Sequence, residues 1–144
     1  MNSAFIDSNI IIKYFAGDTA VKDVLTPVIN YEVEGYVNSI VYSEVIYIVI
    51  KLLTPKKAYE LKGQPETIRN TIKAISKHIE FIRTYFKELE INDKVKQIAI
   101  EIMKEYGLLP NDALIAATCK HYGIDVILTF DEDFMRIPWL KTLP

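Results

Sequence analysis

The chain has 144 residues, half of them hydrophobic and a quarter charged, which is enough for one globular domain and hardly for two. One cysteine and two histidines exclude a disulfide framework and a metal site built from cysteine or histidine alone. The net charge of −2 excludes a globally basic nucleic-acid binder, although a local basic patch remains compatible with it.

The first half of the chain predicts alternating strands and helices. Residues 4–6 form a short apolar run typical of a buried strand. Ser8 or Asn9 is expected to cap a helix that continues to Phe15, where Gly17 ends it. The elements that follow are a helix from Thr26-Pro27 to Gly35, a strand over residues 36–38, and a helix over residues 40–53 capped by Ser39.

The second half continues the alternation. Thr54-Pro55 and Pro65 each predict the start of a helix, the first ending at Gly63 and the second near residue 78, while residues 79–83 suit a helix or a strand. The polar–apolar alternation of residues 87–91 predicts an edge strand. The remaining predictions are a helix from Asn92 to Gly107, a helix over residues 113–122, and a buried strand over residues 126–129.

This alternation predicts an α/β sandwich with a mainly parallel sheet. We expect one domain over residues 1–144, with an additional helical segment at about residues 54–79. The chain start has no basic export signal, and the apolar run over residues 40–50 is shorter than the roughly 20 residues that span a bilayer. We therefore expect a cytoplasmic protein with no membrane contact, and the absence of glycine-rich phosphate loops predicts no nucleotide cofactor.

Four acidic residues occupy positions that solubility does not explain. Asp7 follows the first strand, Asp131 follows the last, and Asp112 opens a helix that is expected to start at the same sheet edge. Glu44 lies in an apolar helix with no lysine or arginine three or four residues away. Carboxylates about 4 Å apart repel by about 4 kcal/mol per pair at an effective dielectric constant near 20, and Mg²⁺ or Mn²⁺ relieves such repulsion. Metal-assisted phosphodiester hydrolysis is the chemistry that fits.

Each acid also has a purely structural explanation. Asp7 and Asp112 suit helix starts, Asp131 and Asp133 suit turns, and Glu44 is ordinary if its helix face is exposed. These explanations serve for each position alone and poorly for all four together.

The same residues carry a resemblance to a known family. The chain resembles the PIN-domain nucleases, and most closely the small VapC-type toxins of toxin–antitoxin pairs. The likeness is carried in order by Asp-Ser-Asn (7–9), Ser-Glu-Val (43–45), Asn-Asp-Ala-Leu-Ile-Ala-Ala-Thr (111–118) and Thr-Phe-Asp-Glu-Asp-Phe (129–134). It implies a three-layer α/β/α sandwich, Mg²⁺ or Mn²⁺ as cofactor, and endonucleolytic cleavage of RNA.

Residue by residue, the resemblance puts the metal-binding acids at Asp7, Glu44, Asp112 and Asp131, with Asp133 as a further acid used by some members. Asn9 and Thr129 match polar residues that orient these acids. The partners it implies are a small antitoxin protein and a second copy of the chain. Basic residues near the acidic elements or in the lysine-rich segment are candidate RNA contacts: Lys13, Lys51, Lys56, Lys57 and Arg136.

Two other functions remain open at this stage. A housekeeping nuclease that processes ribosomal or messenger RNA without an antitoxin has the same sequence features. A PIN-like interaction module that has lost catalysis is the alternative from a different class, and the presence of all four acids argues against it.

Overall fold

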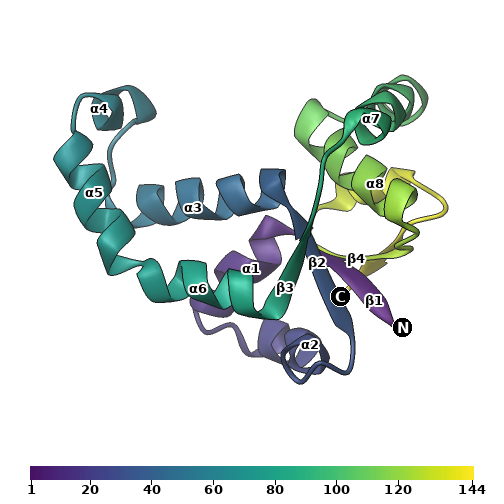
Figure 1. Cartoon of the computed structure of the whole chain (residues 1–144), viewed down its shortest axis with the longest axis horizontal. Helices are drawn as coiled ribbons and strands as arrows, with labels where there is room; N and C mark the ends of the chain where they lie inside the picture. Colours follow the sequence, from purple (N-terminus) through teal and green to yellow (C-terminus); the bar gives the residue numbers. More distant parts are fainter.

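Five short strands form the centre of the computed structural model, which describes residues 1–144 (Figure 1). They are β1 (Ser3–Ile6), β2 (Glu34–Asn38), β3 (Phe86–Leu89), β4 (Val126–Leu128) and β5 (Lys141–Leu143). Their order in the sheet is β3-β2-β1-β4-β5, and every neighbouring pair is parallel. The prediction of a central parallel sheet is therefore confirmed.

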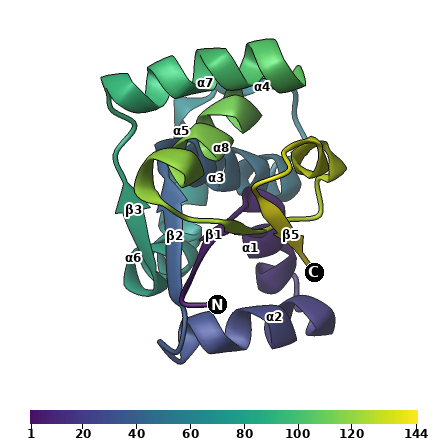
Figure 2. The ribbon, with the colours of Figure 1, turned by 90° about the vertical axis from the view of Figure 1, so that its right-hand side faces the viewer.

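Helices cover both faces of this sheet. On one face, α7 (Asp93–Tyr106) packs against α8 (Pro110–Tyr122), and α8 lies in front of the sheet in Figure 2. On the other face, α1 (Ser8–Phe15) packs against α2 (Thr19–Ile29) and α3 (Ser39–Leu53). No helix of the chain is both long enough and apolar enough to cross a membrane.

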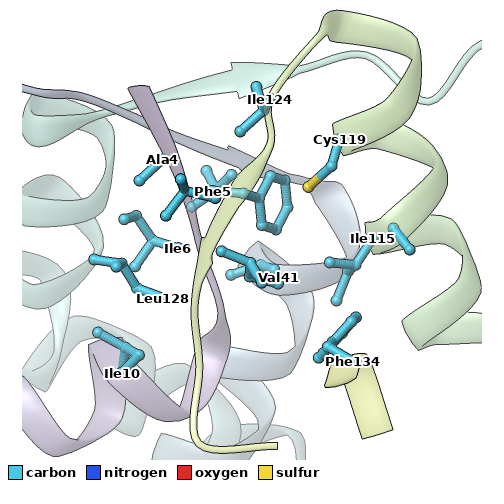
Figure 3. Packing of buried hydrophobic residues seen from close by; sticks show 14 of the residues in the cluster. Ala4, Phe5, Ile6, Ile10, Val41, Ile115, Cys119, Ile124, Leu128 and Phe134 are labelled. Atoms are coloured by element: carbon cyan, nitrogen blue, oxygen red, sulfur yellow. The ribbon is translucent and has the colours of Figure 1, made fainter. Parts of the chain in front are cut away.

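The strands bury apolar side chains on both faces, as strands of a covered parallel sheet do. Phe5 points toward Ile115 and Cys119 of α8, whereas Ile6 and Leu128 lie on the side of α1 (Figure 3). All five side chains are fully buried. The thiol of Cys119 therefore packs as a small hydrophobic group.

A helical arm extends away from the sheet (Figure 1). We define this arm as residues 54–85; it contains α4 (Ala58–Lys62), α5 (Pro65–Ala74) and α6 (Ser76–Tyr85). The chain leaves the sheet along α3 and returns along α6, which leads directly into β3. The additional segment expected at residues 54–79 corresponds to α4, α5 and the start of α6.

The helix predicted from Thr26 to Gly35 is wrong. The chain instead forms α2, which starts eight residues earlier in sequence than the predicted first helical residue, Pro27. The side chain of Asp18 accepts a hydrogen bond from the backbone N–H of Val21 at 3.1 Å and so caps this helix. Pro27 then lies in the last turn, where its missing N–H costs one hydrogen bond of the helix.

Other boundaries also differ from the predictions. Asp7 and Asn38 cap α1 and α3, in place of Ser8 or Asn9 and of Ser39. Thr54 ends α3 instead of starting a helix, because its N–H and its hydroxyl both donate to the carbonyl of Ile50. The ambiguous residues 79–83 belong to α6, and β5 was not predicted.

We expect Gly35→Ala to lower the free energy of unfolding by about 1–3 kcal/mol, because the added methyl overpacks the sheet–helix contact. A Cβ atom at this position would lie 2.5 Å from Cγ1 of Val28 and 2.9 Å from Cδ1 of Phe86, and both side chains are buried. Chemical denaturation measures the change. Gly63→Ala is the matched control, since its Cβ would meet only a carbonyl oxygen at 3.6 Å; equal stability of the two variants would contradict the packing explanation.

Candidate functional site

The site lies at the point in the sheet where the strand order reverses, between β1 and β4. From β1 at the centre, the chain continues to β2 on one side, and β4 pairs with β1 on the other. Ligands of open parallel sheets bind outside the carboxyl ends of the strands at such a switch point. Asp7 follows β1 and Asp131 follows β4, so these two carboxylates lie at that position.

Asp7 is held by three neighbouring groups. Its Oδ1 accepts the backbone N–H of Ser8 at 2.8 Å, and its Oδ2 accepts the hydroxyl of Thr129 at 2.7 Å and the amide of Asn9 at 3.3 Å. Burial raises the pKa of this carboxyl, and the charge of Asp131 adds to the rise, whereas the hydrogen bonds from Thr129 and Ser8 oppose it. The side chain is therefore fixed in direction while its negative charge remains uncompensated.

Thr129 connects the two strand ends. Its hydroxyl donates to Asp7 and accepts the backbone N–H of Asp131 at 2.9 Å. The amide oxygen of Asn9 accepts the backbone N–H of Phe130 at 3.1 Å. Asn9 and Thr129, expected from the sequence to orient the acids, thus hydrogen-bond to Asp7 and to the loop that carries Asp131.

Glu44 reaches the same site from the second turn of α3. Its Oε1 lies 3.5 Å from the hydroxyl of Ser8, which is a long hydrogen bond. Burial raises the pKa of the Glu44 carboxyl, and the negative charges of Asp7 and Asp131 raise it further. The apolar helix therefore directs its one acid toward the other two.

Asp112 completes the cluster from the first turn of α8. One carboxylate oxygen from each of Asp112, Asp131 and Asp133 lies within 4.8 Å of the others. The pKa of Asp112 is raised to about 7, first by burial and then by the negative charges of Asp131, Asp7, Glu44 and Asp133. Asp7 and Glu44 are not part of this group of three, but they lie near enough for their charges to act on Asp112, so all five acids that the sequence singles out belong to one region of the fold.

No basic side chain neutralises the four principal acids. The five ion pairs of the chain include neither Asp7, Glu44, Asp112 nor Asp131. Only Asp133 is paired, with Arg136 at 3.1 Å. Several carboxylate oxygens that face one another without a cation form the donor set that hard divalent cations prefer. The residues present therefore fit a divalent metal, and Asp7, Glu44, Asp112 and Asp131, with Asp133, could hold it.

The five predicted RNA contacts lie in different surroundings. The ammonium of Lys13 lies 4.7 Å from the centre of the Phe130 ring, beside the acidic site. The ammonium of Lys51 donates to the carbonyl of Lys56, and that of Lys56 donates to Gln64. Lys57 is exposed at the start of α4. Arg136 is engaged by Asp133 and by the carbonyl of Gly107, the latter at 3.3 Å.

One contact that connects two elements of the site was not predicted from the sequence. The buried amide of Asn38 donates to the hydroxyl of Thr118 at 3.0 Å, and its oxygen accepts the backbone N–H of Val41 at 3.2 Å. It thereby joins the start of α3, which carries Glu44, to α8, which carries Asp112. A buried asparagine directly before a helix is the only sequence signal for it, and the partner 80 residues away leaves none.

Comparisons with known proteins agree with this geometry. The family model described as PIN domain matches residues 4–140, and the chain belongs to the PIN-domain family. It is a homologue of VapC ribonucleases: it is 40% identical over 143 residues to Ribonuclease VapC2 of Methanocaldococcus jannaschii, covering 99% of this chain and 93% of that protein. Ribonuclease VapC6 of the same organism is 32% identical over 148 residues, with 99% and 97% covered.

Solved structures share the fold. A toxin–antitoxin complex from Klebsiella pneumoniae matches with a TM-score of 0.65 at 22% identity, covering 98% of this chain and 96% of that one. VapBC2 from Rickettsia felis, bound to a DNA fragment from its promoter, matches with a TM-score of 0.65 at 19% identity, covering 98% and 97%. At these identities the likeness concerns the fold.

We expect Asp112→Asn to stabilise the metal-free protein near neutral pH. The pKa of Asp112 is about 7 in the folded chain against 3.8 for an ordinary aspartate, so the folded state binds a proton that the unfolded state has lost. The free energy of unfolding therefore falls as the pH rises from about 4 to 7. Thermal unfolding in chelator should show a shallower fall for Asp112→Asn, with Tm at pH 7.5 higher by about 3 °C, the shift that about 1 kcal/mol produces in a domain of this size.

Asp23→Asn, in an exposed position of α2, is the control for the same chemical change outside the cluster. Its Tm should follow that of the wild type at every pH. Identical pH profiles for wild type and Asp112→Asn would show that neither burial nor the neighbouring acids raise the pKa of Asp112.

Proposed function

We propose that this protein is an endoribonuclease that uses Mg²⁺ or Mn²⁺ to hydrolyse phosphodiester bonds of RNA, and that it is the toxin of a VapBC-type pair. The observation that carries this proposal is the group of four carboxylates without a basic partner at the switch point of the sheet. Homology to VapC ribonucleases supports RNA as the substrate.

In this proposal the acids divide into two groups. Asp7, Glu44 and Asp112 would hold the first metal ion, directly or through water, and Asp131, with Asp133, would help Asp7 to hold a second ion or would orient the attacking water. Asn9 and Thr129 keep the Asp7 carboxylate in position through the hydrogen bonds described above. A bound divalent cation supplies Lewis-acid stabilisation of the charge that develops on the phosphate oxygens.

The reaction that follows is a simple hydrolysis. A water oxygen attacks phosphorus and gives up a proton, the bond to the 3′ oxygen breaks, and that oxygen takes up a proton, so that one water molecule is consumed. The products carry a 5′ phosphate and a 3′ hydroxyl. Asp112, whose pKa of about 7 lies near the working pH of most cells, loses its proton when a cation binds, so cation affinity is expected to fall below pH 7.

The partners belong to the same proposal. We infer a small antitoxin protein, supported by the toxin–antitoxin complexes that share this fold. We also infer a homodimer, for which the arm and the second half of α3 offer exposed apolar side chains: Tyr47, Leu52, Leu53 and Tyr59. A cytoplasmic location follows from such a substrate and such a partner.

The arm is the proposed contact for the RNA backbone, and charge segregation supports it. Residues 54–85 contain seven lysines or arginines and three glutamates, a net charge of +4, whereas the other residues contain ten basic and sixteen acidic side chains, a net charge of −6. The two values sum to the −2 of the whole chain. Lys56 and Lys57 belong to this basic segment, and Lys51 lies just before it.

We expect Asp112→Asn and Asp7→Asn each to lower the rate of RNA cleavage in Mg²⁺ or Mn²⁺ by at least about 100-fold, the order of loss for removing one charge-stabilising group from an active site. Cleavage of labelled RNA, with analysis of the product ends, measures the effect. Asp23→Asn is the matched control and should cleave like the wild type. Full activity of both site variants would refute the assignment.

The same variants separate the competing functions. Expression of a toxin without its antitoxin arrests growth and the Asp112→Asn variant does not, whereas a housekeeping nuclease leaves growth unaffected in both forms. An interaction module without catalysis shows neither cleavage nor an increase in Tm with Mn²⁺.

For the arm, we expect replacing Lys57, Lys62 and Lys73 by glutamine to weaken RNA binding and to reduce its salt dependence. Each phosphate contact in single-stranded RNA contributes about 0.7 to the slope of log affinity against log salt concentration, so three lost contacts reduce the slope by about 2. Fluorescence anisotropy in the cleavage-deficient Asp112→Asn background measures it. The control replaces Lys22, Lys94 and Lys141, which lie outside the arm; equal slopes for the two triple variants would exclude the arm as the docking surface.

A further inference from the structure

An exposed aromatic ring stands directly beside the acidic cluster. Phe130 lies between Thr129 and Asp131, and 42% of its surface is exposed. Its backbone N–H donates to the amide oxygen of Asn9, so the ring projects from a loop that the site's own hydrogen bonds hold in place. The Asp131 and Thr129 side chains explain the fold of this loop, but they give no reason for a phenyl ring in solvent.

The ring forms one wall of a hollow next to the cluster. Phe130 and Met135, which is 68% exposed, line this hollow of about 230 Å³ together with Pro144 at the chain end. Its remaining lining includes Thr129 and Asp131. A group in the hollow therefore lies next to whatever is bound at the carboxylates.

A positive charge that belongs to no ion pair lies over the Phe130 ring. The ammonium of Lys13 lies 4.7 Å from the centre of the Phe130 ring, and Lys13 takes part in no ion pair. Stacking platforms for single-stranded RNA combine these two features: an aromatic face for a base and a cation for the adjacent phosphate.

We propose that the Phe130–Met135 hollow binds one nucleobase of the RNA substrate beside the cleaved bond, with the base stacked on Phe130 and a phosphate of that nucleotide bound by Lys13. This proposal rests on the ribonuclease function proposed above. It makes Phe130 a substrate-positioning residue, and it assigns to Lys13 a specific phosphate.

The charges around the hollow favour a base over a protein segment. Asp131 and Glu132 line it, so an acidic peptide is repelled, and a basic peptide side chain would have to approach Lys13. A nucleobase is neutral and flat, and the phosphate of the same nucleotide is attached through the ribose, away from the base. The neutral base therefore suits the acidic hollow while its phosphate suits the ammonium.

We expect Phe130→Ala to weaken binding of an unstructured oligoribonucleotide by about ten-fold, within the range found for removal of one stacking side chain. The measurement is fluorescence anisotropy in the Asp112→Asn background. Phe130→Leu, which keeps an apolar side chain, should lose nearly as much, whereas Phe130→Trp should bind within about two-fold of the parent. Ile100→Ala, which shortens an exposed apolar side chain on α7, is the matched control and should have no effect.

A scan with abasic nucleotides then locates the stacked base. With Phe130 present, one abasic position near the cleaved bond should lower the affinity by about the same ten-fold. In Phe130→Ala that position should have no further effect, because the two changes remove the same contact. Lys13→Gln should reduce the salt slope by about 0.7, the value for one phosphate contact.

Different results would refute the stacking proposal and the proposed ribonuclease function. The stacking proposal would be overturned if the wild type binds and cleaves RNA, Phe130→Ala binds it with equal affinity, and the abasic scan is the same for both proteins. The hollow would then be a contact for a protein segment. Absence of cleavage of any RNA by the wild type in Mg²⁺ or Mn²⁺ would instead refute the proposed function.

Discussion

Electrostatic repulsion among carboxylates is the constraint on which the rest of this structure depends. A fold that gathers Asp7, Glu44, Asp112 and Asp131 without a basic partner accepts a cost in stability. Burial raises the pKa of Asp112 first, and the negative charges of the neighbouring acids raise it further. Such an arrangement persists only if surrounding packing fixes it. The buried residues of the central strands β1 and β4 and the helices on both faces supply that packing.

The hydrogen bonds at the site hold the acids in position without neutralising them. Thr129, Asn9 and Ser8 are uncharged donors, so they fix the direction of the Asp7 carboxylate and leave its charge available. A lysine in their place would fix the carboxylate equally well and would compete with a cation. Neutral donors around the carboxylate are therefore consistent with the proposed cation site.

The site was more predictable from the sequence than the helix boundaries were. Asp7 and Asp131 follow apolar strands, and the parallel sheet brings the ends of such strands to one edge, so their proximity follows from topology alone. The start of α2 depends instead on a competition between Asp18 and Thr26-Pro27 as local signals, which packing of Val21 and Leu25 decides. The strand β5 is three residues long and has no apolar alternation, and the Asn38–Thr118 contact joins residues 80 positions apart; neither leaves a local pattern.

In the proposed function, the separation of charge between the arm and the rest of the chain overcomes a difficulty that the acidic site creates. The residues outside the arm carry a net charge of −6 and repel a polyanion such as RNA. Cations bound at the carboxylates would neutralise only the immediate site. The helices of the arm place a net charge of +4 away from the carboxylates, where phosphates can bind without disturbing the metal ligands. A chain with the same charges evenly mixed would lack both the unpaired carboxylates of the proposed cation site and the basic arm proposed to bind phosphates. The net charge of −2 therefore combines a basic arm with an acidic remainder of the chain, and the proposed function depends on the fold keeping the two apart.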